Sequence, residues 1–284
     1  MTSIFVIKKQ HLVFIKKIIL YVVLTSTGFF LALPFLWTLL TALKEPAQIW
    51  IFPPQLIPKP FVWQNFPKAF SVMHFVLHLK NTLIVVFGSL AGVLLSCSLV
   101  AYGFARFRFP GRDILFIILL GTLMIPAQVT IIPLFIIFVR IGWVNSFKPL
   151  IVPAFFGYPF YIFLLRQFFM TIPRELDEAT IIDGGSYFTI FAHVILPLCK
   201  PALAAVIIFH FIGSWNDFFG PLIYLNDNTK YTLSVALANF QGVYGTHWEW
   251  LMAASIMVAL PCIVLFFFTQ KFFIHGIALT GMKG

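Results

Sequence analysis

Asn81–Ala105 reads NTLIVVFGSLAGVLLSCSLVAYGFA, and the basic turn RFRFPGR follows it directly as residues 106–112. The 25 residues of the first stretch include no Asp, Glu, Lys or Arg, and a helix of about 20 largely apolar residues can cross the hydrocarbon core of a bilayer. Arg106, Arg108 and Arg112 supply the positive charge that is typical of cytoplasmic loops. The stretch is therefore predicted to be a transmembrane helix that ends in the cytoplasm.

The composition of the whole chain indicates the same class of protein. Of its 284 residues, 61% are hydrophobic and 10% are charged, whereas a soluble domain has about 25% charged residues. So few charges cannot cover a water-facing surface, which excludes a soluble enzyme, a nucleic-acid-binding protein and a disordered scaffold. Membrane lipid is the expected surrounding. The net charge of +10 is explained by cytoplasmic loops rather than by a nucleic-acid partner.

Uncharged runs predict an all-α integral membrane protein with six transmembrane helices in a single domain, residues 1–284. The expected spans are about 18–43, 81–105, 114–139, 149–165, 201–225 and 250–270. The 26 uncharged residues of the first run are too many for a cleavable signal peptide, so this span is expected to be uncleaved. Pro126 and Pro133 predict a bend in the third span.

Six spans put both termini on one side of the membrane, and the charges place that side in the cytoplasm. The predicted inner segments carry twelve Lys and Arg residues and the outer segments carry seven, which is the usual direction of the bias. One alternative stays open, because residues 184–199 are uncharged over 16 positions and could form part of a membrane re-entry. A span there would make seven and would leave the C-terminal tail outside.

The outer segment between the first two spans is rich in proline, which breaks helices and indicates an external loop. Within it, residues 63–78 are expected to form a short interfacial helix. His74 and His78 are four residues apart and share a face of such a helix. A metal site needs more ligands than these two, so no metal site is expected. The three cysteines form no C-x-x-C pair and are expected to be buried as small apolar side chains.

The predicted cytoplasmic segment between spans four and five, residues 167–200, contains IPRELDEATIIDGGS as residues 172–186. Pro173 suits the first turn of a helix. The acidic residues that follow it lie near the positive end of the helix dipole, which favours each of them by about 0.3–1 kcal/mol. An acidic helix at the membrane surface is therefore expected here.

The sequence also predicts where this acidic helix ends. Gly184 or Gly185 can take the left-handed backbone conformation that ends a helix. Ser186 is expected to cap a second, apolar helix that stops at Pro197. Two short helices joined by a glycine corner form a rigid docking surface for another protein.

Glu178-Ala179-Thr180, three residues, Gly184, nine residues and Val194-Ile-Leu-Pro197 resembles the cytoplasmic EAA loop of ABC importer permeases. The consensus of that loop is E-A-A, three residues, G, nine residues, I-x-L-P. Thr180 stands in place of the second alanine and Val194 in place of isoleucine. Both changes are conservative, so the resemblance holds.

Further motifs resemble permeases of the carbohydrate-uptake family, the group that contains the smaller permease of the maltose importer. They are residues 101–112, 215–222, 231–234 and 273–284. The resemblance covers essentially the whole chain. It implies a type I ABC importer permease fold, a transmembrane core at residues 77–272, and a location in the cell inner membrane with both termini cytoplasmic.

The resemblance also implies partners. They are a second homologous permease subunit, two ATP-binding subunits and an extracytoplasmic solute-binding protein. In such permeases the EAA loop contains the helix that couples the permease to the ATPase. The residues that this resemblance assigns to the ATPase contact are Glu178, Ala179, Asp183, Gly184, Leu196 and Pro197.

No catalytic residue and no cofactor is expected in the chain itself. A phosphate-binding loop ends in Gly-Lys-Ser or Gly-Lys-Thr, and no lysine here follows a glycine or precedes Ser or Thr. ATP and Mg are expected on the partner ATPase subunits. The chain is therefore expected to be a transport subunit and not an enzyme.

Two further sets of candidates concern the solute. A charged residue in a span is a functional candidate, so Asn216 and Asp217 are expected to line the outer pathway, although solvation of Asp217 at the interface is the plainer reading. The segment 226–248 is expected to be an external loop, and by resemblance it contacts the binding protein. The residues proposed for this contact are Gly242, Tyr244, Gly245 and Trp248, with an ordinary exposed loop as the alternative.

The competing function is a stand-alone secondary transporter or channel for a small polar solute. Ion-coupled carriers place ionisable residues near the bilayer midplane, and the predicted spans one to four and six contain no Asp, Glu, Lys or Arg between their ends. An importer subunit is therefore favoured. A disaccharide, an oligosaccharide, a sugar-like osmolyte and glycerol-3-phosphate all remain open as its solute.

Overall fold

The computed structural model describes residues 2–243 and 247–281. These residues form helices and connecting turns, with no strand among them, which confirms the all-α fold class.

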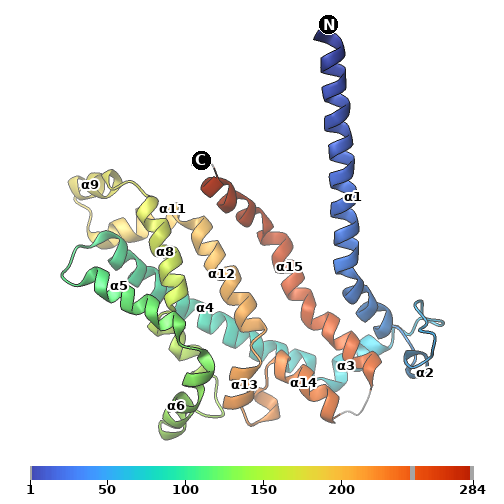
Figure 1. Ribbon diagram of the computed structural model, residues 1–284. Coiled ribbons are helices and arrows are strands. Elements are labelled where there is room, and N and C mark those ends of the chain that lie inside the picture. Colours follow the sequence, from blue (N-terminus) through green and yellow to red (C-terminus); the bar gives the residue numbers. More distant parts are fainter. Residues whose placement is uncertain (1, 244–246, 282–284) are drawn as a thin grey trace. The chain divides into compact units, whose positions relative to one another are not determined.

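The described chain forms two compact units, whose helices are drawn in Figure 1. Unit 1 consists of residues 2–72 and 247–257, and unit 2 of residues 73–243 and 258–281. Each unit has its own packing, and the site described below lies within unit 2.

Unit 1 contains α1 (Thr2–Ala42), α2 (Pro46–Ile49), α3 (Asn65–Val72) and the first turns of α15 (Trp248–Gly281). The side chains of residues 14–37 on α1 are exposed, although this part of the helix is strongly apolar. An apolar surface of this size needs lipid or another protein to cover it. This agrees with the predicted first span.

The segment after α1 differs from the expected helix over residues 63–78. Asn65 is buried and donates from Nδ2 to the carbonyls of Ala42 and Lys44, both at 2.9 Å. α3 starts at this residue but ends at Val72, because His74 adopts the left-handed backbone conformation, with φ +48° and ψ +46°. His74 and His78 therefore do not share one helix.

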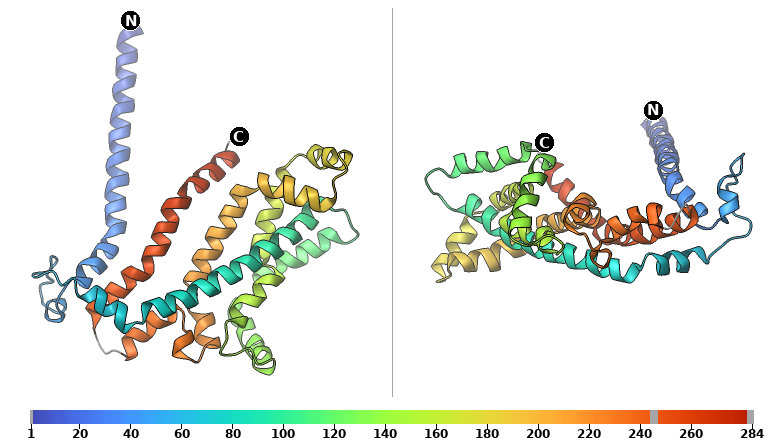
Figure 2. Two further views of the ribbon diagram at one scale, coloured as in Figure 1. Left: turned by 180° about the vertical axis from the view of Figure 1, so that it is seen from behind. Right: turned by 90° about the horizontal axis from the view of Figure 1, so that it is seen from below.

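The centre of unit 2 is α4 (Phe75–Arg106). α8 (Pro159–Thr171), α12 (Lys200–Trp215) and the 3-10 turn η2 (Val152–Phe156) pack against it (Figures 1 and 2). At Gly92 the two elements come close, since a Cβ there would lie 2.6 Å from Cδ2 of the Phe155 ring and 3.0 Å from the backbone carbonyl carbon of Ala154. Small residues allow this kind of approach between membrane helices.

The remaining elements of unit 2 connect and extend these helices. They are α5 (Arg112–Gly121), η1 (Thr122–Met124), α6 (Ala127–Arg140), α7 (Lys148–Ile151), α9 (Glu175–Ile182), α10 (Tyr187–Thr189), the π-helical turn η3 (Ile190–Ile195), α11 (Leu196–Leu198), α13 (Phe219–Tyr224), η4 (Asn228–Lys230) and α14 (Leu233–Val243).

Four stretches of the described chain are long and apolar enough to cross a membrane. They are Phe14–Ala42, Phe75–Arg106, Lys148–Thr171 and Trp248–Thr269. Two bent helix pairs, Arg112–Met124 with Gln128–Arg140 and Tyr187–Leu198 with Lys200–Trp215, raise the number to six if each pair counts as one span. The second pair turns by 76°.

The predicted bend in the third span lies at Pro126, where the backbone is extended with φ −61° and ψ +134°. Pro133 stays inside α6. The break therefore arises at one of the two prolines on which the prediction rested.

The helix that contains the end of the fourth predicted span, 149–165, does not end at Leu165 but runs on to Thr171. Arg166 is accommodated in it because its guanidinium carbon lies 4.0 Å from the centroid of the Phe116 ring and Nε donates to the carbonyl of Phe104 at 3.4 Å. The segment that is predicted to be cytoplasmic, 167–200, therefore starts within this helix.

The fifth predicted span, 201–225, is not one helix. α12 ends at Trp215 and α13 begins at Phe219. At this break Oδ1 of Asp217 accepts a hydrogen bond from the backbone N–H of Gly220 at 3.1 Å, which satisfies a donor that a continuous helix would have paired internally. In α15 the stretch that is long and apolar enough to cross a membrane is Trp248–Thr269, and the helix itself continues to Gly281.

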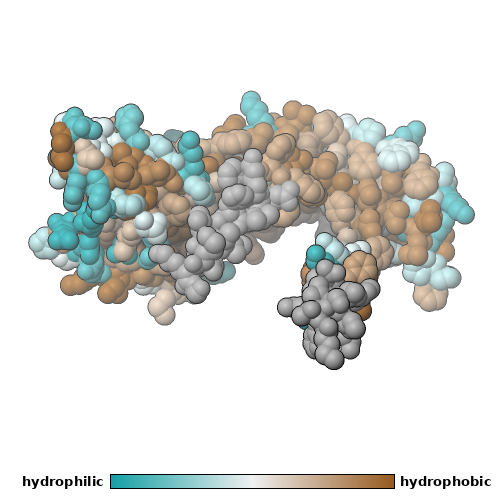
Figure 3. Space-filling view, turned by 90° about the horizontal axis from the view of Figure 1, so that it is seen from above, coloured by the Kyte–Doolittle hydropathy of each residue, from teal (hydrophilic) through white to brown (hydrophobic). Residues whose placement is uncertain are grey.

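The surface of unit 2 has the composition of a membrane protein. On α5, the side chains of Ile114, Ile117 and Ile118 are all more than half exposed. Figure 3 shows apolar side chains over much of the face that it draws, with polar ones gathered at the end of unit 2 that carries α9. Lipid or a partner subunit is the surrounding that such a surface requires.

Candidate functional site

The acidic helix α9 ends in a glycine corner, as the sequence predicts. Gly184 has φ +82°, which only glycine adopts at little cost. Its N–H donates to the carbonyl of Ile181 at 3.0 Å, and the N–H of Gly185 donates to the carbonyl of Thr180 at 2.8 Å. These two bonds form a Schellman motif, which satisfies the last carbonyls of the helix.

Gly185 is also required, for a different reason. A Cβ at this position would lie 2.7 Å from Cγ2 of Thr180 and 2.8 Å from the Thr180 carbonyl oxygen. The corner therefore needs glycine twice, once for its φ angle and once for space.

The second arm of the corner starts with the predicted cap. Ser186 Oγ accepts from the N–H of Thr189, and Oγ1 of Thr189 accepts from the N–H of Ser186, both at 3.2 Å. This reciprocal pair is a capping box. The arm does not stop at Pro197, because α11 runs to Leu198 after the π-helical turn. We attribute this turn to Pro197, which lacks an N–H to pair with the preceding turn.

An ion pair connects α9 to the end of α4. Nε of Arg106, the last residue of α4, lies 3.1 Å from Oδ2 of Asp177 in the first turn of α9. Both terminal nitrogens of Arg106 donate to the carbonyl of Ile172 at 3.1 Å. The Arg106 side chain is 4% exposed and the Asp177 side chain 16%. The acidic helix is therefore fixed to the core helix and is not a free appendage.

Burial raises the pKa of the Asp177 carboxyl above its ordinary value, while the positive charge of Arg106 acts to lower it. Arg106 supplies the larger part of the charge compensation of this carboxylate, and Arg174 also acts to lower its pKa. A buried ion that loses its partner is strongly unfavourable. Arg106 is consequently the residue on which the position of α9 depends most.

The second arm has its own connection to α4. The Tyr102 hydroxyl donates to the carbonyl of Tyr187 at 3.0 Å. The ring of Phe107 lies between the rings of Tyr102 and Tyr187, with centroid distances of 5.3 Å and 5.2 Å. α4 therefore contacts both arms of the corner, which lie at the end of α4 in Figure 1 and in the left view of Figure 2.

The outer face of the corner is exposed and mixed in character. Of the residues assigned from the sequence, Leu196 is half-buried and the other five are exposed: Glu178, Ala179, Asp183, Gly184 and Pro197. Exposed apolar side chains lie among them, with Ile181 48%, Ile182 84% and Phe188 69% exposed. An apolar patch bordered by acidic groups is the usual composition of a protein-binding surface.

Sequence reasoning missed three contributors to this surface. Arg106 was interpreted only as a marker of the cytoplasmic side, and Asp177 only as a helix-dipole charge. Ile182 is part of the quoted motif but was given no role. The spacing of Arg106 and Asp177, 71 positions apart, gives no local signal for their contact.

The other candidate residues lie away from this corner. Asp217 lies at the break between α12 and α13 and lines a cavity of unit 2, whereas Asn216 is exposed and donates from Nδ2 back to the carbonyl of Ile212 at 2.8 Å. Gly242 lies in α14, and Tyr244 and Gly245 lie outside the described residues. Trp248, in unit 1, packs edge to face on Trp50 with 6.2 Å between ring centroids.

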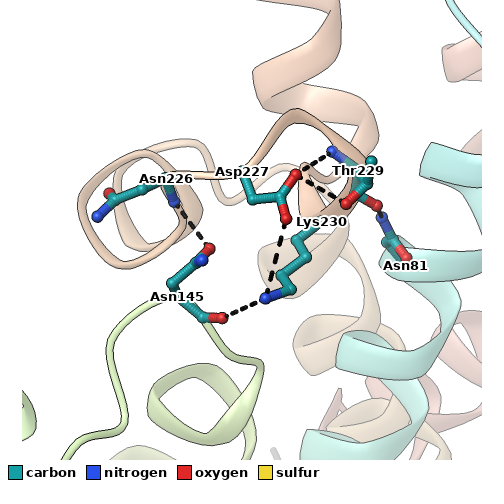
Figure 4. A network of polar contacts seen from close by, with 6 residues as sticks. All are labelled: Asn81, Asn145, Asn226, Asp227, Thr229 and Lys230. Atoms are coloured by element: carbon teal, nitrogen blue, oxygen red, sulfur yellow. Dashed lines mark hydrogen bonds and ion pairs between the residues drawn. The ribbon is translucent and has the colours of Figure 1, made fainter.

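The segment expected to be an open external loop, 226–248, is partly helical and is tied down at its start. Figure 4 shows the contacts. Asn145 accepts from the Lys230 ammonium at 2.9 Å and from the Asn226 N–H at 3.2 Å, and Asn81 of α4 donates to the Thr229 carbonyl at 2.8 Å. Polar side chains therefore fix the segment to two other parts of unit 2.

Comparison with known proteins places this geometry in context. The sequence is 31% identical over 275 residues to the trehalose/maltose transport system permease protein MalG of Thermococcus litoralis, covering 95% of this chain and 98% of the relative. It is 38% identical over 191 residues to the arabinooligosaccharides transport system permease protein AraQ of Halalkalibacterium halodurans, covering 67% and 68%. With the sn-glycerol-3-phosphate transport system permease protein UgpE of Yersinia pestis it shares 32% identity over 241 residues, covering 82% and 85%.

The fold is similar to that of a chain in the crystal structure of a bacterial ABC transporter involved in the import of the acidic polysaccharide alginate. The TM-score is 0.79 with 24% sequence identity, covering 91% of this chain and 96% of that one. Residues 84–278 match the family described as binding-protein-dependent transport system inner membrane component. That match covers more than half of the sequence, and the chain belongs to this family of inner-membrane transport permeases.

Proposed function

We propose that this chain forms half of the translocation pore of an ATP-driven importer for a sugar or sugar-like solute. Its family membership and its relatives, which include permeases for trehalose/maltose and arabinooligosaccharides, support this function. An extracytoplasmic binding protein would deliver the solute, and a second homologous permease would form the other half of the pore.

ATP and Mg would be bound by two separate subunits. The observation that carries this part of the proposal is the corner formed by α9 and α10, with its exposed patch around Ile182 and its buried attachment to Arg106. An ATPase subunit bound to this patch would displace α9 when it moves. The ion pair between Asp177 and Arg106 would then displace the end of α4 as well. Closure of the ATPase dimer would then favour one of two states of the pore.

The contact with the ATPase is assigned to Glu178, Ala179, Asp183, Gly184, Leu196 and Pro197. The first four lie on or next to the exposed end of α9, and the last two lie in α11. The contact with the binding protein is assigned to Gly242, Tyr244, Gly245 and Trp248, and Asn216 and Asp217 to the outer pathway.

Replacement of one glycine tests the coupling. Gly184→Asp places a Cβ and a charge at φ +82° in open space, so the corner is strained without an internal clash. In the whole reconstituted importer we expect uptake to fall at least tenfold while the subunits still assemble. Gly142→Asp is the matched control, because Gly142 also has a positive φ, +68°, with nothing within 4 Å of a Cβ. Equal uptake by both variants would contradict the assignment.

The alternative, a stand-alone carrier or channel, is tested in the same vesicles. The chain reconstituted without ATP-binding subunits should transport no sugar. Solute uptake by the isolated chain, driven by an ion gradient or by the solute gradient alone, would replace the importer proposal with this alternative.

A further inference from the structure

Unit 2 has an open cavity of about 390 Å³ between α4, α8 and α12. This size falls within the range of about 300–1,000 Å³ that is typical of small-molecule sites. The lining side chains used in the argument are Ser89, Tyr158, Tyr161, His210, Ser214 and Asp217. We refer to this space as the α12 cavity.

The α12 cavity lies far from the cytoplasmic corner. Ser89 and Arg106 are separated by 17 residues on one uninterrupted helix, which is about 25 Å along its axis. The cavity is therefore independent of the residues assigned to the ATPase contact.

Aromatic rings form one wall of the cavity. The centroids of Tyr158 and Tyr161 both lie 5.9 Å from that of His210, with interplanar angles of 52° and 80°. The faces of aromatic rings carry partial negative charge. The C–H bonds on the face of a sugar ring carry partial positive charge and pack well on such surfaces.

The polar groups of the cavity are held in place by the protein. Nε2 of His210 lies 2.8 Å from Oγ of Ser89, and both side chains are buried. Asp217 is oriented by the N–H of Gly220, which donates to its Oδ1. Fixed acceptors and donors beside aromatic rings are what a hydroxyl-rich ring requires.

The charge of the lining excludes one class of solute. Asp217 is its one acidic residue, and no lysine or arginine occurs among the described residues that line it. A phosphate or a carboxylate would find no lysine or arginine here and would face the Asp217 carboxyl group, while Nε2 of His210 is already paired with Ser89 Oγ. Such desolvated anions are unfavourable without a counter-charge.

We propose that the α12 cavity binds a ring of an uncharged sugar, and that this chain thus selects neutral sugars over anionic solutes. The inference rests on the proposed importer function and makes its substrate class narrower. It separates the solutes named for the relatives: trehalose/maltose and arabinooligosaccharides are neutral, whereas sn-glycerol-3-phosphate is an anion.

The test uses the whole importer, purified and reconstituted, with its binding protein. Equilibrium binding and uptake are measured with a panel of labelled neutral sugars, including maltose, trehalose and arabinotriose, and with labelled sn-glycerol-3-phosphate. We expect at least one neutral sugar to bind and to be taken up, and the anion to do neither. Uptake of the anion, or failure of every neutral sugar while ATP hydrolysis stays coupled to the binding protein, would overturn the proposal.

Substitutions in the cavity lining test whether the sugar binds in the α12 cavity itself. Tyr161→Ala removes an aromatic face and should raise the dissociation constant of the neutral sugar about five- to tenfold, while Tyr161→Phe should keep the wild-type value within about twofold. Asp217→Asn retains the acceptor for Gly220 but loses the charge, and should weaken binding about tenfold. Phe163→Ala is the control, because Phe163 lies on the same helix as Tyr161 and stacks on Phe116 instead.

These outcomes distinguish the two proposals. An importer that transports a neutral sugar equally well with all four variants would retain the proposed function and disprove the cavity as its binding site. A complex in which the binding protein stimulates no ATP hydrolysis at all would disprove both.

Discussion

Arg106 and Asp177 form an ion pair with 3.1 Å between Nε and Oδ2, although one is the last residue of a core helix and the other lies in the first turn of the acidic helix α9. The same guanidinium binds the Ile172 carbonyl, so it holds both α9 and the chain that enters α9. The first arm of the corner is thus joined to α4 through the Arg106 side chain, as the second arm is through Tyr102.

Replacing Arg106 and replacing Asp177 should lower the stability of the complex by different amounts. Arg106→Ala leaves the Asp177 carboxylate half-buried without its counter-charge, whereas Asp177→Asn leaves Arg106 with the Ile172 carbonyl. We expect the arginine variant to lower the thermal stability of the complex more, and the double variant to cost less than the sum of the two by about 0.5–3 kcal/mol. Additive effects in this double-mutant cycle would show that the pair does not couple the helices.

Substitutions at Thr180 and Gly185, on either side of the glycine corner, should have different effects on uptake. Thr180→Ala removes a hydroxyl that bonds to the Leu176 carbonyl of its own helix, together with the Cγ2 methyl, so uptake should stay within about twofold of wild type. Gly185→Ala puts a Cβ 2.8 Å from the Thr180 carbonyl oxygen and should reduce uptake strongly. Because the clash is with backbone, the combination with Thr180→Ala should not restore uptake; recovery in that double variant would contradict the geometry.

Gly92 should be sensitive to the smallest side chain. Gly92→Ala forces the new Cβ against Phe155 and the Ala154 backbone, and overpacking of this kind costs about 1–3 kcal/mol. Gly103→Ala is the control on the same helix, with nothing within 4 Å of its Cβ, and should be neutral or slightly stabilising. Thermal unfolding of the purified complex measures both, and an equal shift in the two would mean that α4 and η2 do not pack closely.

Asn145 should be needed to hold the start of the outer segment. It has φ +60° and binds both Lys230 and Asn226. Both Asn145→Gly and Asn145→Ala lose the Oδ1 that accepts from Asn226 and keep the backbone carbonyl that Lys230 uses. Only the alanine variant also strains the backbone at φ +60°. Limited proteolysis between residues 226 and 243 should therefore be faster in the alanine variant than in the glycine variant, and both should exceed wild type.

Local features of this chain could be predicted from sequence, and long-range ones could not. The glycine corner at Gly184 and the cap at Ser186 depend on residues within a few positions of each other. Local sequence motifs were therefore sufficient to predict both, and the structure confirms them. The extension of α8 past Leu165 depends on Arg166 packing on Phe116, 50 positions earlier. The hydropathy of the segment gives no information about that contact, so the sequence did not predict how far the helix extends.

At Asn216–Phe218 the sequence also failed to predict a helix end, but here the helix ends earlier than expected instead of later. The apolar residues on both sides of this break predict one continuous span, yet Asp217 accepts a hydrogen bond from the Gly220 N–H and lines the α12 cavity. Asp217 was identified as a candidate because a charge in a span is unusual, but its neighbours in the cavity come from α4 and α8. The ATPase contact itself stays a prediction, since it depends on the surface of another protein.

The unbroken length of α4 has a mechanical consequence. Its 32 residues extend about 48 Å, and Ser89 lies near the middle of that rod, with Arg106 at one end. A stiff rod that tilts about its midpoint swings its two ends in opposite directions while its centre stays almost in place. A displacement of Arg106 would thus move the other end of α4 in the opposite direction. That end lies near Asn81, which donates to the Thr229 carbonyl. The part of α4 that lines the α12 cavity would be the pivot of this movement.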